Sequence, residues 1–215
     1  MKRFVAVPVA VLVLGLAACE PGAPRAADGR SASQSGRAAT VDENTGIPDR
    51  MLVTRRDLGG AGWDEVALPA SSGWSFALRD CVGYHDADYP AQRRRLAVRG
   101  TAFSQGRAGR LVQALIELYP PGWSAEALDD VRGVVQNCGR YEHIASLHSH
   151  SIVEVDFAGQ EALLVHSTEI WPYEEPTEWW TAVVRRDDLV ATVTGHGLTD
   201  TELRKIAIKA AARLN

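Results

Sequence analysis

The sequence is poor in cysteine, has no excess of positive charge and lacks the motifs of the common enzyme classes. It contains three cysteines, and its 23 Lys and Arg residues against 27 Asp and Glu residues give a formal net charge of −4 at pH 7. Nucleic-acid-binding domains usually carry a basic excess, so no nucleic-acid partner is expected. The chain has no Gly-x-Ser-x-Gly, Ser-x-x-Lys or His-Glu-x-x-His pattern and no phosphate-binding glycine loop. We therefore expect no catalytic residues, no cofactor and no enzymatic activity.

The amino end has the arrangement of a secretory signal peptide. Lys2 and Arg3 precede an apolar run from Phe4 to Ala18. As a helix this run would be about 22 Å long, short of the roughly 30 Å of bilayer hydrocarbon, so it is too short for a transmembrane anchor. Residues 1–18 are predicted to be the signal peptide.

The signal peptide ends on Leu16-Ala17-Ala18-Cys19, which resembles the lipobox of bacterial lipoproteins. The resemblance implies that the Cys19 thiol takes a diacylglyceryl group and that Cys19 becomes the first residue. Two acyl chains hold a soluble domain on a bilayer. We expect a protein anchored by lipid on the extracytoplasmic face of the cell membrane. Loss of Lys2 and Arg3 makes the net charge more negative, which disfavours direct adhesion to anionic headgroups.

The other two cysteines, Cys81 and Cys138, would then lie in an oxidising compartment, where an even pair is expected to form a disulfide. Such a bridge would contribute about 4 kcal/mol on the chain-entropy model. The alternative is two buried free thiols, because a bridge requires Cα atoms within about 7 Å of each other.

The rest of the chain divides into a tether and one domain. Residues 19–47 are rich in Pro, Gly, Ala, Ser and Arg without apolar periodicity, which predicts a flexible tether. Residues 48–215 are expected to form one folded domain, since 46% of the sequence is hydrophobic. A wholly disordered or fibrous chain is thereby excluded.

Within the domain, apolar periodicity predicts an α+β fold with a twisted antiparallel sheet of about six strands and helices packed on one face. Thr54 and Asp57 suggest the cap of a short helix within 51–60. A four-residue loop would place Phe157 opposite Ala162. The expected strands cover residues 95–105, 110–119, 147–157, 162–171, 177–186 and 189–195. The expected long helices begin at Ser124, with Leu128, Val131, Val135 and Cys138 buried, and after a Thr199–Glu202 capping box, with Leu203, Ile206, Ala210 and Leu214 buried.

The order of these features resembles the actinobacterial sensor-domain lipoproteins, which are similar to the PknH-like extracellular sensor domains of mycobacterial Ser/Thr protein kinases. The resemblance is carried by the lipobox, the tether, the phrase Leu52 to Trp63, the two cysteines and the Val183–Val190 segment before a last helix. It implies an antiparallel sheet with packed helices, a cleft for a small ligand and no established chemistry. The kinase sensors have two disulfides, whereas this domain has cysteines for one.

His148 and His150 form the pattern closest to a metal site. Residues i and i+2 of a strand point to the same face about 7 Å apart, and Glu169, opposite His150 in the expected register, would be a third ligand. The alternative is a solvated polar face of a half-exposed sheet. With no Cys or further closely spaced His nearby, we expect no metal.

The segment 171–180, called here the Trp-rich hairpin, contains three tryptophans, two prolines and three acids. Trp180 shares a face with Ala182 and Val184 and is expected in the core. The residues expected to bind a ligand are Trp171, Trp179, Tyr173, Arg185, His148 and His150. The alternative is an aromatic lid over the edge of the sheet.

These observations favour a lipid-anchored, extracytoplasmic sensor or small-ligand-binding domain without catalytic activity. Two alternatives remain, a cell-envelope protein-interaction module that uses the Trp-rich hairpin and a metal-dependent hydrolase that uses His148 and His150. The expected partner is an unknown small ligand or a cell-envelope protein, with membrane contact through the lipid anchor.

Overall fold

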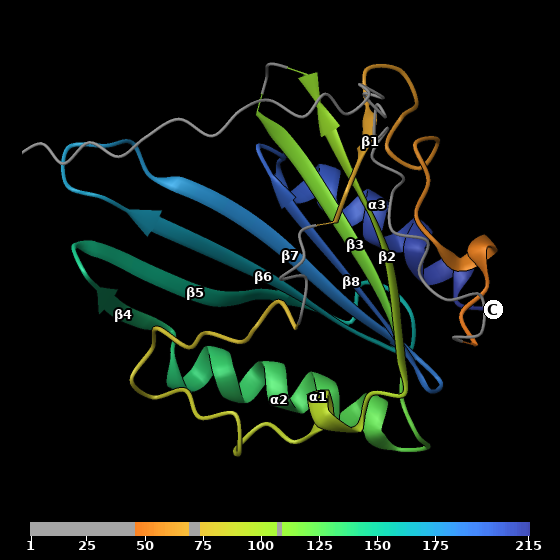
Figure 1. The fold of residues 1–215 in the computed structure, drawn as a ribbon, viewed down its shortest axis with the longest axis horizontal. Helices are drawn as coiled ribbons and strands as arrows, with labels where there is room; N and C mark the ends of the chain where they lie inside the picture. The colour runs from red at the N-terminus through yellow and green to blue at the C-terminus, as the bar shows by residue number, and fades with distance from the viewer. Residues whose placement is uncertain (1–45, 69–73, 107–108) are drawn as a thin grey trace, which may run out of the picture. The chain divides into compact units, whose positions relative to one another are not determined.

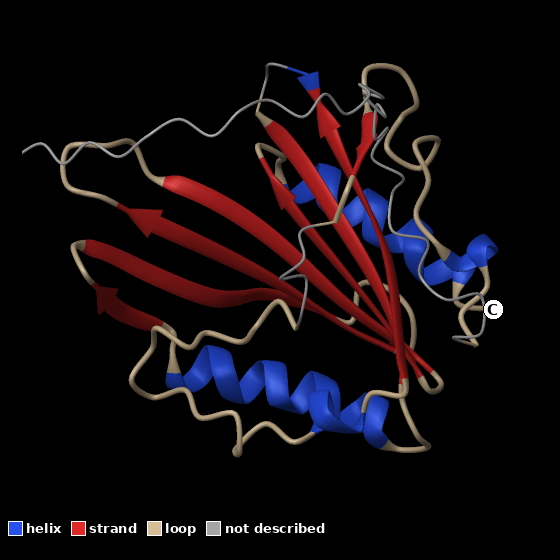
Figure 2. Cartoon of the chain, viewed as in Figure 1, coloured by secondary structure: helices blue, strands red, loops and turns tan. Residues whose placement is uncertain are grey.

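The computed structural model describes residues 46–68, 74–106 and 109–215, which form one eight-stranded antiparallel sheet with a long helix on each face (Figures 1 and 2). The strand order is β1-β2-β3-β8-β7-β6-β5-β4. The strands are β1 (Asp64–Val66), β2 (Ala97–Gln105), β3 (Arg110–Leu118), β4 (Arg140–His143), β5 (Ser146–Val155), β6 (Glu161–Ile170), β7 (Thr177–Arg186) and β8 (Leu189–His196). The helices are η1 (Asp49–Met51), α1 (Ala91–Arg94), α2 (Trp123–Asn137) and α3 (Asp200–Arg213).

The expected α+β class is confirmed, but the sheet has eight strands rather than about six. The two additional strands are β1 and β4, which lie at the two edges. Both are short, and β1 is exposed throughout. They carry no apolar alternation, since they form by pairing with the edges of β2 and β5 rather than by burying a hydrophobic face.

The prediction that both long helices cover one face is wrong. Leu163 and Val183 pack with α2, whereas their neighbours Leu164 and Val184 pack with α3. Consecutive side chains of a strand point to opposite faces, so the two helices lie on opposite sides of the sheet. The central strands accordingly carry continuous apolar runs, such as 162–165, and such runs are typical of a sheet that is buried on both faces.

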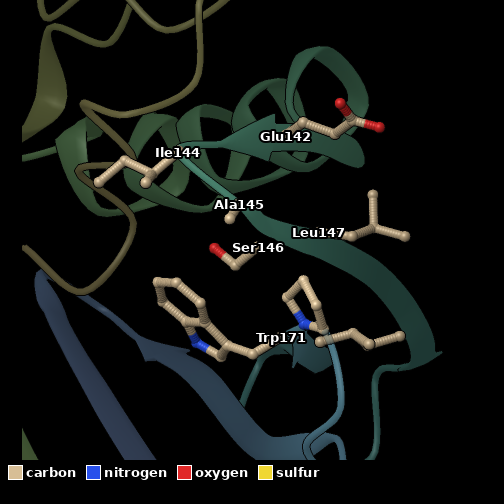
Figure 3. A pocket seen from close by; sticks show the side chains of 8 residues that line it. Glu142, Ile144, Ala145, Ser146, Leu147 and Trp171 are labelled. Atoms are coloured by element: carbon tan, nitrogen blue, oxygen red, sulfur yellow. The ribbon is translucent and has the colours of Figure 1, made fainter. Parts of the chain in front are cut away.

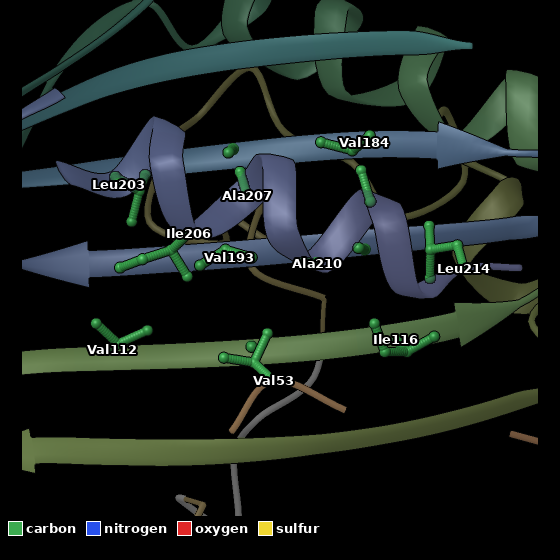
Figure 4. Close-up of a cluster of buried hydrophobic side chains, with 14 of the residues drawn as sticks. Val53, Val112, Ile116, Val184, Val193, Leu203, Ile206, Ala207, Ala210 and Leu214 are labelled. Carbon is green, nitrogen blue, oxygen red and sulfur yellow. The ribbon is translucent and has the colours of Figure 1, made fainter. Parts of the chain in front are cut away.

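Helix α3 follows the predicted pattern. Thr199 and Glu202 form the capping box, in which each side chain bonds the other residue's backbone N–H. The predicted apolar stripe packs on β3, β7 and β8, as Figure 4 shows. Its members Leu203, Ile206, Ala210 and Leu214 are all buried.

Helix α2 begins differently from the expectation. Gly122 is the N-cap, with a φ of 86°, and Ser124 does not cap the helix. Its hydroxyl donates instead to the Asp187 carbonyl at 2.5 Å, which ties α2 to the β7–β8 turn. The predicted buried residues of α2 are confirmed, and they are Leu128, Val131, Val135 and Cys138.

The predicted disulfide is present. Cys81 is bonded to Cys138, with their Cα atoms 6.0 Å apart. The bridge holds the segment before α1 against the end of α2, where Trp74, Tyr84 and Tyr89 pack on the same hydrophobic cluster. One loop is thus fixed by both a covalent bond and aromatic packing.

The start of the folded part also differs from the sequence expectation. Residues 51–60 form turns rather than a helix, and the only helical turn there is η1. Thr54 and Asp57 do interact, because the Thr54 hydroxyl and N–H both donate to the Asp57 carboxylate at 2.8 Å. Ile47 is already buried in the core. The signal peptide, Cys19 and the tether up to residue 45 lie outside the described residues.

The register of β5 and β6 is not the one expected. His148 lies opposite Glu169, and the pairing shifts at a bulge between Ile152 and Glu154. The turn is also longer than expected, since the last backbone hydrogen bond runs from the Asp156 N–H to the Ala162 carbonyl. As a result Glu154 faces α3, where it pairs with Arg204 at 2.9 Å, rather than sharing a face with His148. A bulge adds one residue to one strand and shifts every later side chain.

Candidate functional site

Polar and aromatic side chains line the face of the sheet that carries α2, beyond the area that α2 covers. The strand pairing aligns His150, Ser167, Trp179 and His196 in one row across β5, β6, β7 and β8. We call this row the histidine–tryptophan row. Trp179 and His196 are in contact, with ring centroids 5.7 Å apart. All four side chains come from strands that the sequence predicted, although His196 lies one residue beyond the predicted end of its strand.

A second row lies next to it and contains Tyr141, His148 and Glu169 from β4, β5 and β6. The Tyr141 ring stacks on His148, with centroids 4.8 Å apart and planes 6° apart, and it also stacks on His150 at 5.9 Å. Burial raises the pKa of Tyr141, with nearby Asp80 and Glu169 adding to the shift. The tyrosine therefore stays neutral and holds both imidazole rings by packing.

The imidazole of His150 is partly withdrawn from solvent. Its Nδ1 lies 2.8 Å from the Ser167 hydroxyl, and its Nε2 is buried with no hydrogen-bond partner among the described residues. Burial, together with the nearby His148, lowers the pKa of His150 to about 4. The imidazole is therefore neutral at physiological pH.

Ser146, His148 and Glu169 have the residue types of a catalytic triad but not its geometry. The Ser146 hydroxyl donates to the His143 carbonyl at 3.1 Å and lies 2.8 Å from His148 Nε2. Glu169 approaches the same Nε2, at 3.7 Å. In a triad the acid holds the Nδ1 side while Nε2 takes the proton of the nucleophile. Because both partners meet one nitrogen here, the group does not activate Ser146 as a nucleophile.

A pocket of about 340 Å³ opens where β4 and β6 end and β5 begins. Figure 3 shows the indole of Trp171 facing Ser146, with Ile144 and Ala145 on the other side of the space. The walls are mainly apolar, and Glu142 supplies the one carboxylate. Ser146 joins this pocket to the second row, because it contacts His148. The lining residues are Glu142, Ile144, Ala145, Ser146, Leu147, Ile170, Trp171 and Pro172.

The structure brings four of the six predicted ligand-binding residues to one region. His148, His150 and Trp179 lie in the two rows, and Trp171 lines the pocket beside them. Tyr173 is fully exposed at the tip of the β6–β7 connection and lines no part of the pocket.

Arg185 lies apart from these residues, near the end of β7 that is opposite to Trp179. Its guanidinium is bound by the Glu161 carboxylate at 3.1 Å and by Gln160. Arg185 therefore has the contacts of a structural residue rather than of a ligand contact.

The corrected register also changes the metal hypothesis. Glu169 lies next to His148 rather than opposite His150. In the described ranges, no group of three or more His, Cys, Asp or Glu side chains is placed to hold a metal ion. The two histidines instead contact Tyr141 and two serines.

Sequence reasoning missed Tyr141, Ser146 and Ser167. Tyr141 lies on a strand too short to show a pattern, and the two serines are recognised only once the register is known. The alternation in residues 147–157 predicts that polar side chains of this strand share one face. It does not predict which side chains of the neighbouring strands they contact.

Comparison with solved structures finds a protein whose fold is similar to that of this chain. No protein-family model and no curated protein matches the chain. The crystal structure of the extracellular domain of PknH from Mycobacterium tuberculosis is similar, with a TM-score of 0.50 and 16% identity, over 76% of this chain and 92% of that one. The chain has the PknH sensor-domain fold. An uncharacterised protein from Mycobacterium smegmatis, an Rv0999 orthologue, matches with a TM-score of 0.40 and 15% identity, over 75% of this chain and 97% of its own.

The PknH-like fold confirms the resemblance inferred from the order of sequence features. The sheet with its packed helices is what that resemblance implied. None of the described helices is both long enough and apolar enough to cross a bilayer.

Proposed function

We propose that this chain is a lipid-anchored, extracytoplasmic sensor domain that binds a small molecule without chemically changing it. The fold it shares with the extracellular domain of PknH supports the sensor role. The Cys81–Cys138 disulfide fits an oxidising compartment outside the cytoplasm. The lipobox-like Leu-Ala-Ala-Cys sequence supports attachment at Cys19.

The pocket at the ends of β4, β5 and β6 is the observation that carries the proposal. Its volume of about 340 Å³ suits a small ligand, and such sites combine apolar walls with a few polar groups. The Trp171 ring offers a flat apolar surface, while Glu142 lies at the pocket and Glu169 lies in the adjacent row. These features favour a flat molecule that is neutral or cationic over an anion.

The test is a nuclear magnetic resonance titration of residues 46–215, observing the tryptophan indole N–H signals. The probes are indole, benzamidinium and benzoate, which share a flat ring and differ in charge. The Trp171→Phe variant assigns the Trp171 signal. We expect indole and benzamidinium to shift that signal and benzoate to shift it less. If none of the probes moves the Trp171 signal at millimolar concentration, the pocket is not the binding site.

A second candidate is the protein-interaction module. Tyr173 is fully exposed and has a φ of 70°, a conformation that L side chains rarely adopt. Strained, exposed aromatic residues are found at binding surfaces. A photo-crosslinking amino acid at position 173 in intact cells would capture a protein partner at one defined mass if this candidate is right. The same probe at Val82, which is also exposed, is the control.

The metal-dependent hydrolase gains no support from the residues. His148 and His150 are engaged by Tyr141 and by serine hydroxyls, and Glu169 is near only one of them. The Ser146 hydroxyl lacks the geometry of a nucleophile, as described above. The arrangement therefore favours binding over catalysis.

A further inference from the structure

The exposed side of α3 carries a concentration of positive charge that the net charge of the chain does not reveal. Lys205 and Lys209 are exposed on this side, together with Ile208. The turn 54–60 packs beside the helix and adds Arg55 and Arg56, which are also exposed. We call these five residues the α3 basic face.

Contacts between the turn and the helix fix the α3 basic face as one surface. Lys209 Nζ donates to the Asp57 carbonyl at 2.7 Å, and Arg213 binds the Asp57 carboxylate at 2.9 Å. Asp57 is buried and paired, so its negative charge does not reach the surface. The turn therefore presents its arginines next to the lysines of the helix.

Two of the carboxylates near this surface are already paired with other arginines. Glu202 is bound by Arg110 at 2.7 Å, and Glu154 is bound by Arg204 at 2.9 Å. By contrast, the side chains of Lys205, Arg55 and Arg56 have no hydrogen-bond or ion-pair partner among the described residues. Of the two acids of α3, Asp200 in the first turn has no basic partner among the described residues. The surface is thus left with uncompensated positive charge.

A second pocket lies within this surface. It has a volume of about 220 Å³, and its lining includes Lys205, Lys209 and the apolar Leu58 and Trp63. The two acids in the lining, Asp57 and Glu202, are bound by Arg213 and Arg110. Two ammonium groups beside an apolar wall match a phosphate group attached to a glycerol backbone. Ile208 lies between the two lysines in the sequence and on the same exposed face of the helix, with 43% of its surface accessible.

The folded part of the chain also begins beside α3. The Arg213 guanidinium, at the end of α3, donates to the Arg50 carbonyl of η1 at 3.0 Å. The chain that precedes residue 46 therefore joins the domain near the α3 basic face. The opposite side of the sheet carries α2, and there the acidic Asp86 and Asp129 are paired with Arg79 and Arg132.

We propose that the α3 basic face docks on an anionic phospholipid bilayer and orients the domain, so that the α2 side with its two polar rows faces away from the membrane. Each basic side chain near an anionic surface adds attraction that falls off within a Debye length. The net charge of the whole chain argues against such adhesion, but the α3 basic face brings four cationic side chains together in one place. This inference does not depend on ligand binding in the Trp171 pocket.

Vesicle co-sedimentation of residues 46–215 tests the proposal. This fragment contains the whole sheet, both hydrophobic clusters and the disulfide within one compact unit. One set of vesicles contains the zwitterionic lipid phosphatidylcholine alone. The other set contains phosphatidylcholine with about 30% of the anionic lipid phosphatidylglycerol. We expect sedimentation only with the anionic vesicles and release at about 1 M salt, where the Debye length falls to roughly 3 Å.

Two charge-reversal pairs separate a local surface from a general charge effect. Lys205→Glu with Arg56→Glu should weaken binding to the anionic vesicles about tenfold or more. Arg93→Glu with Arg79→Glu makes the same change in net charge on the α2 side and should leave binding nearly unchanged. Equal weakening by both pairs, equal binding to both vesicles or no binding to anionic vesicles would overturn the proposal. Unchanged circular dichroism spectra would show that the variants are folded.

Discussion

Three tryptophans of the Trp-rich hairpin differ in their surroundings although they lie within ten residues of one another. Trp180 packs against the α3 cluster and stacks on His166, with ring centroids 4.2 Å apart. Trp171 instead lines an open pocket, and Trp179 lies in the histidine–tryptophan row. The alternation of the strand explains why neighbouring tryptophans point to opposite faces.

Replacing each tryptophan by alanine should separate these environments. We expect Trp180→Ala to lower the free energy of unfolding by about 3 kcal/mol, because it leaves a cavity beside the core. Trp171→Ala and Trp179→Ala should each cost about 1 kcal/mol or less. Urea denaturation followed by circular dichroism measures all three. A large loss for Trp171→Ala would make that residue part of the core and remove it from the binding site.

The buried imidazole of His150 predicts a pH dependence of stability. Its pKa is about 4 in the folded chain and about 6.5 when unfolded, so between these values the unfolded chain binds more protons. Stability should therefore fall as the pH is lowered from 6.5 to 4, by up to about 3 kcal/mol.

The matched control for that prediction is His150→Phe, which keeps an aromatic ring against Tyr141 but does not titrate. Burial also raises the pKa of Asp130 to about 6, and that group stabilises the fold as the pH falls. Because Asp130 is common to both proteins, the difference between their stabilities reports His150. Identical pH profiles for the two proteins would show that His150 is not buried as described.

At the scale of the elements, the β4–β5 connection contains an unusual residue. The hairpin loop is Ile144-Ala145, and Ile144 has a φ of 56° with 87% of its surface exposed. Two-residue loops with a positive φ at the first position are normally occupied there by glycine. A β-branched residue in that conformation is strained, and here it forms one wall of the pocket.

Ile144→Gly should therefore stabilise the domain by about 1 kcal/mol, since glycine adopts the positive φ without steric cost. Ala145→Gly is the control and should give no gain, because Ala145 does not have a positive φ. Thermal unfolding of the two variants provides the measurement. A loss of stability in Ile144→Gly would mean that the isoleucine side chain contributes more by packing than its conformation costs.

The elements also show how far local sequence pattern reaches. The alternation in 110–118 and the Thr199–Glu202 capping box predicted β3 and α3, because each depends on residues within one element. The β5–β6 register depends on a bulge that no residue type requires, so it could not be predicted. The same bulge decided which acid lies beside His148.

At the scale of the whole molecule, the placement of the helices was the least predictable feature. An apolar stripe shows that a helix packs on the sheet, but the stripes of α2 and α3 are equally compatible with either face. The disulfide could be anticipated from the number of cysteines, whereas the pocket joins two segments, 142–147 and 170–172, that are distant in the sequence. The sequence therefore predicted several residues of the candidate site but not how they are arranged in space.

One substitution in the full-length protein tests lipid attachment. Cys19→Ala removes the thiol that would carry the diacylglyceryl group, so labelling with radioactive palmitate should disappear and the precursor should stay uncleaved. Cys81→Ala is the control and should still be labelled. Normal labelling of the Cys19→Ala protein would refute the lipoprotein assignment.

The central claim is that a small molecule binds between Trp171 and the start of β5. A crystal of residues 46–215 soaked with indole or benzamidinium tests it most directly, with a Trp171→Ala crystal soaked in parallel. We predict density for the probe against the Trp171 ring beside Ser146, and none at that position in the variant. An empty Trp171 pocket, with the probe seated only elsewhere or bound equally in the variant, would contradict the claim.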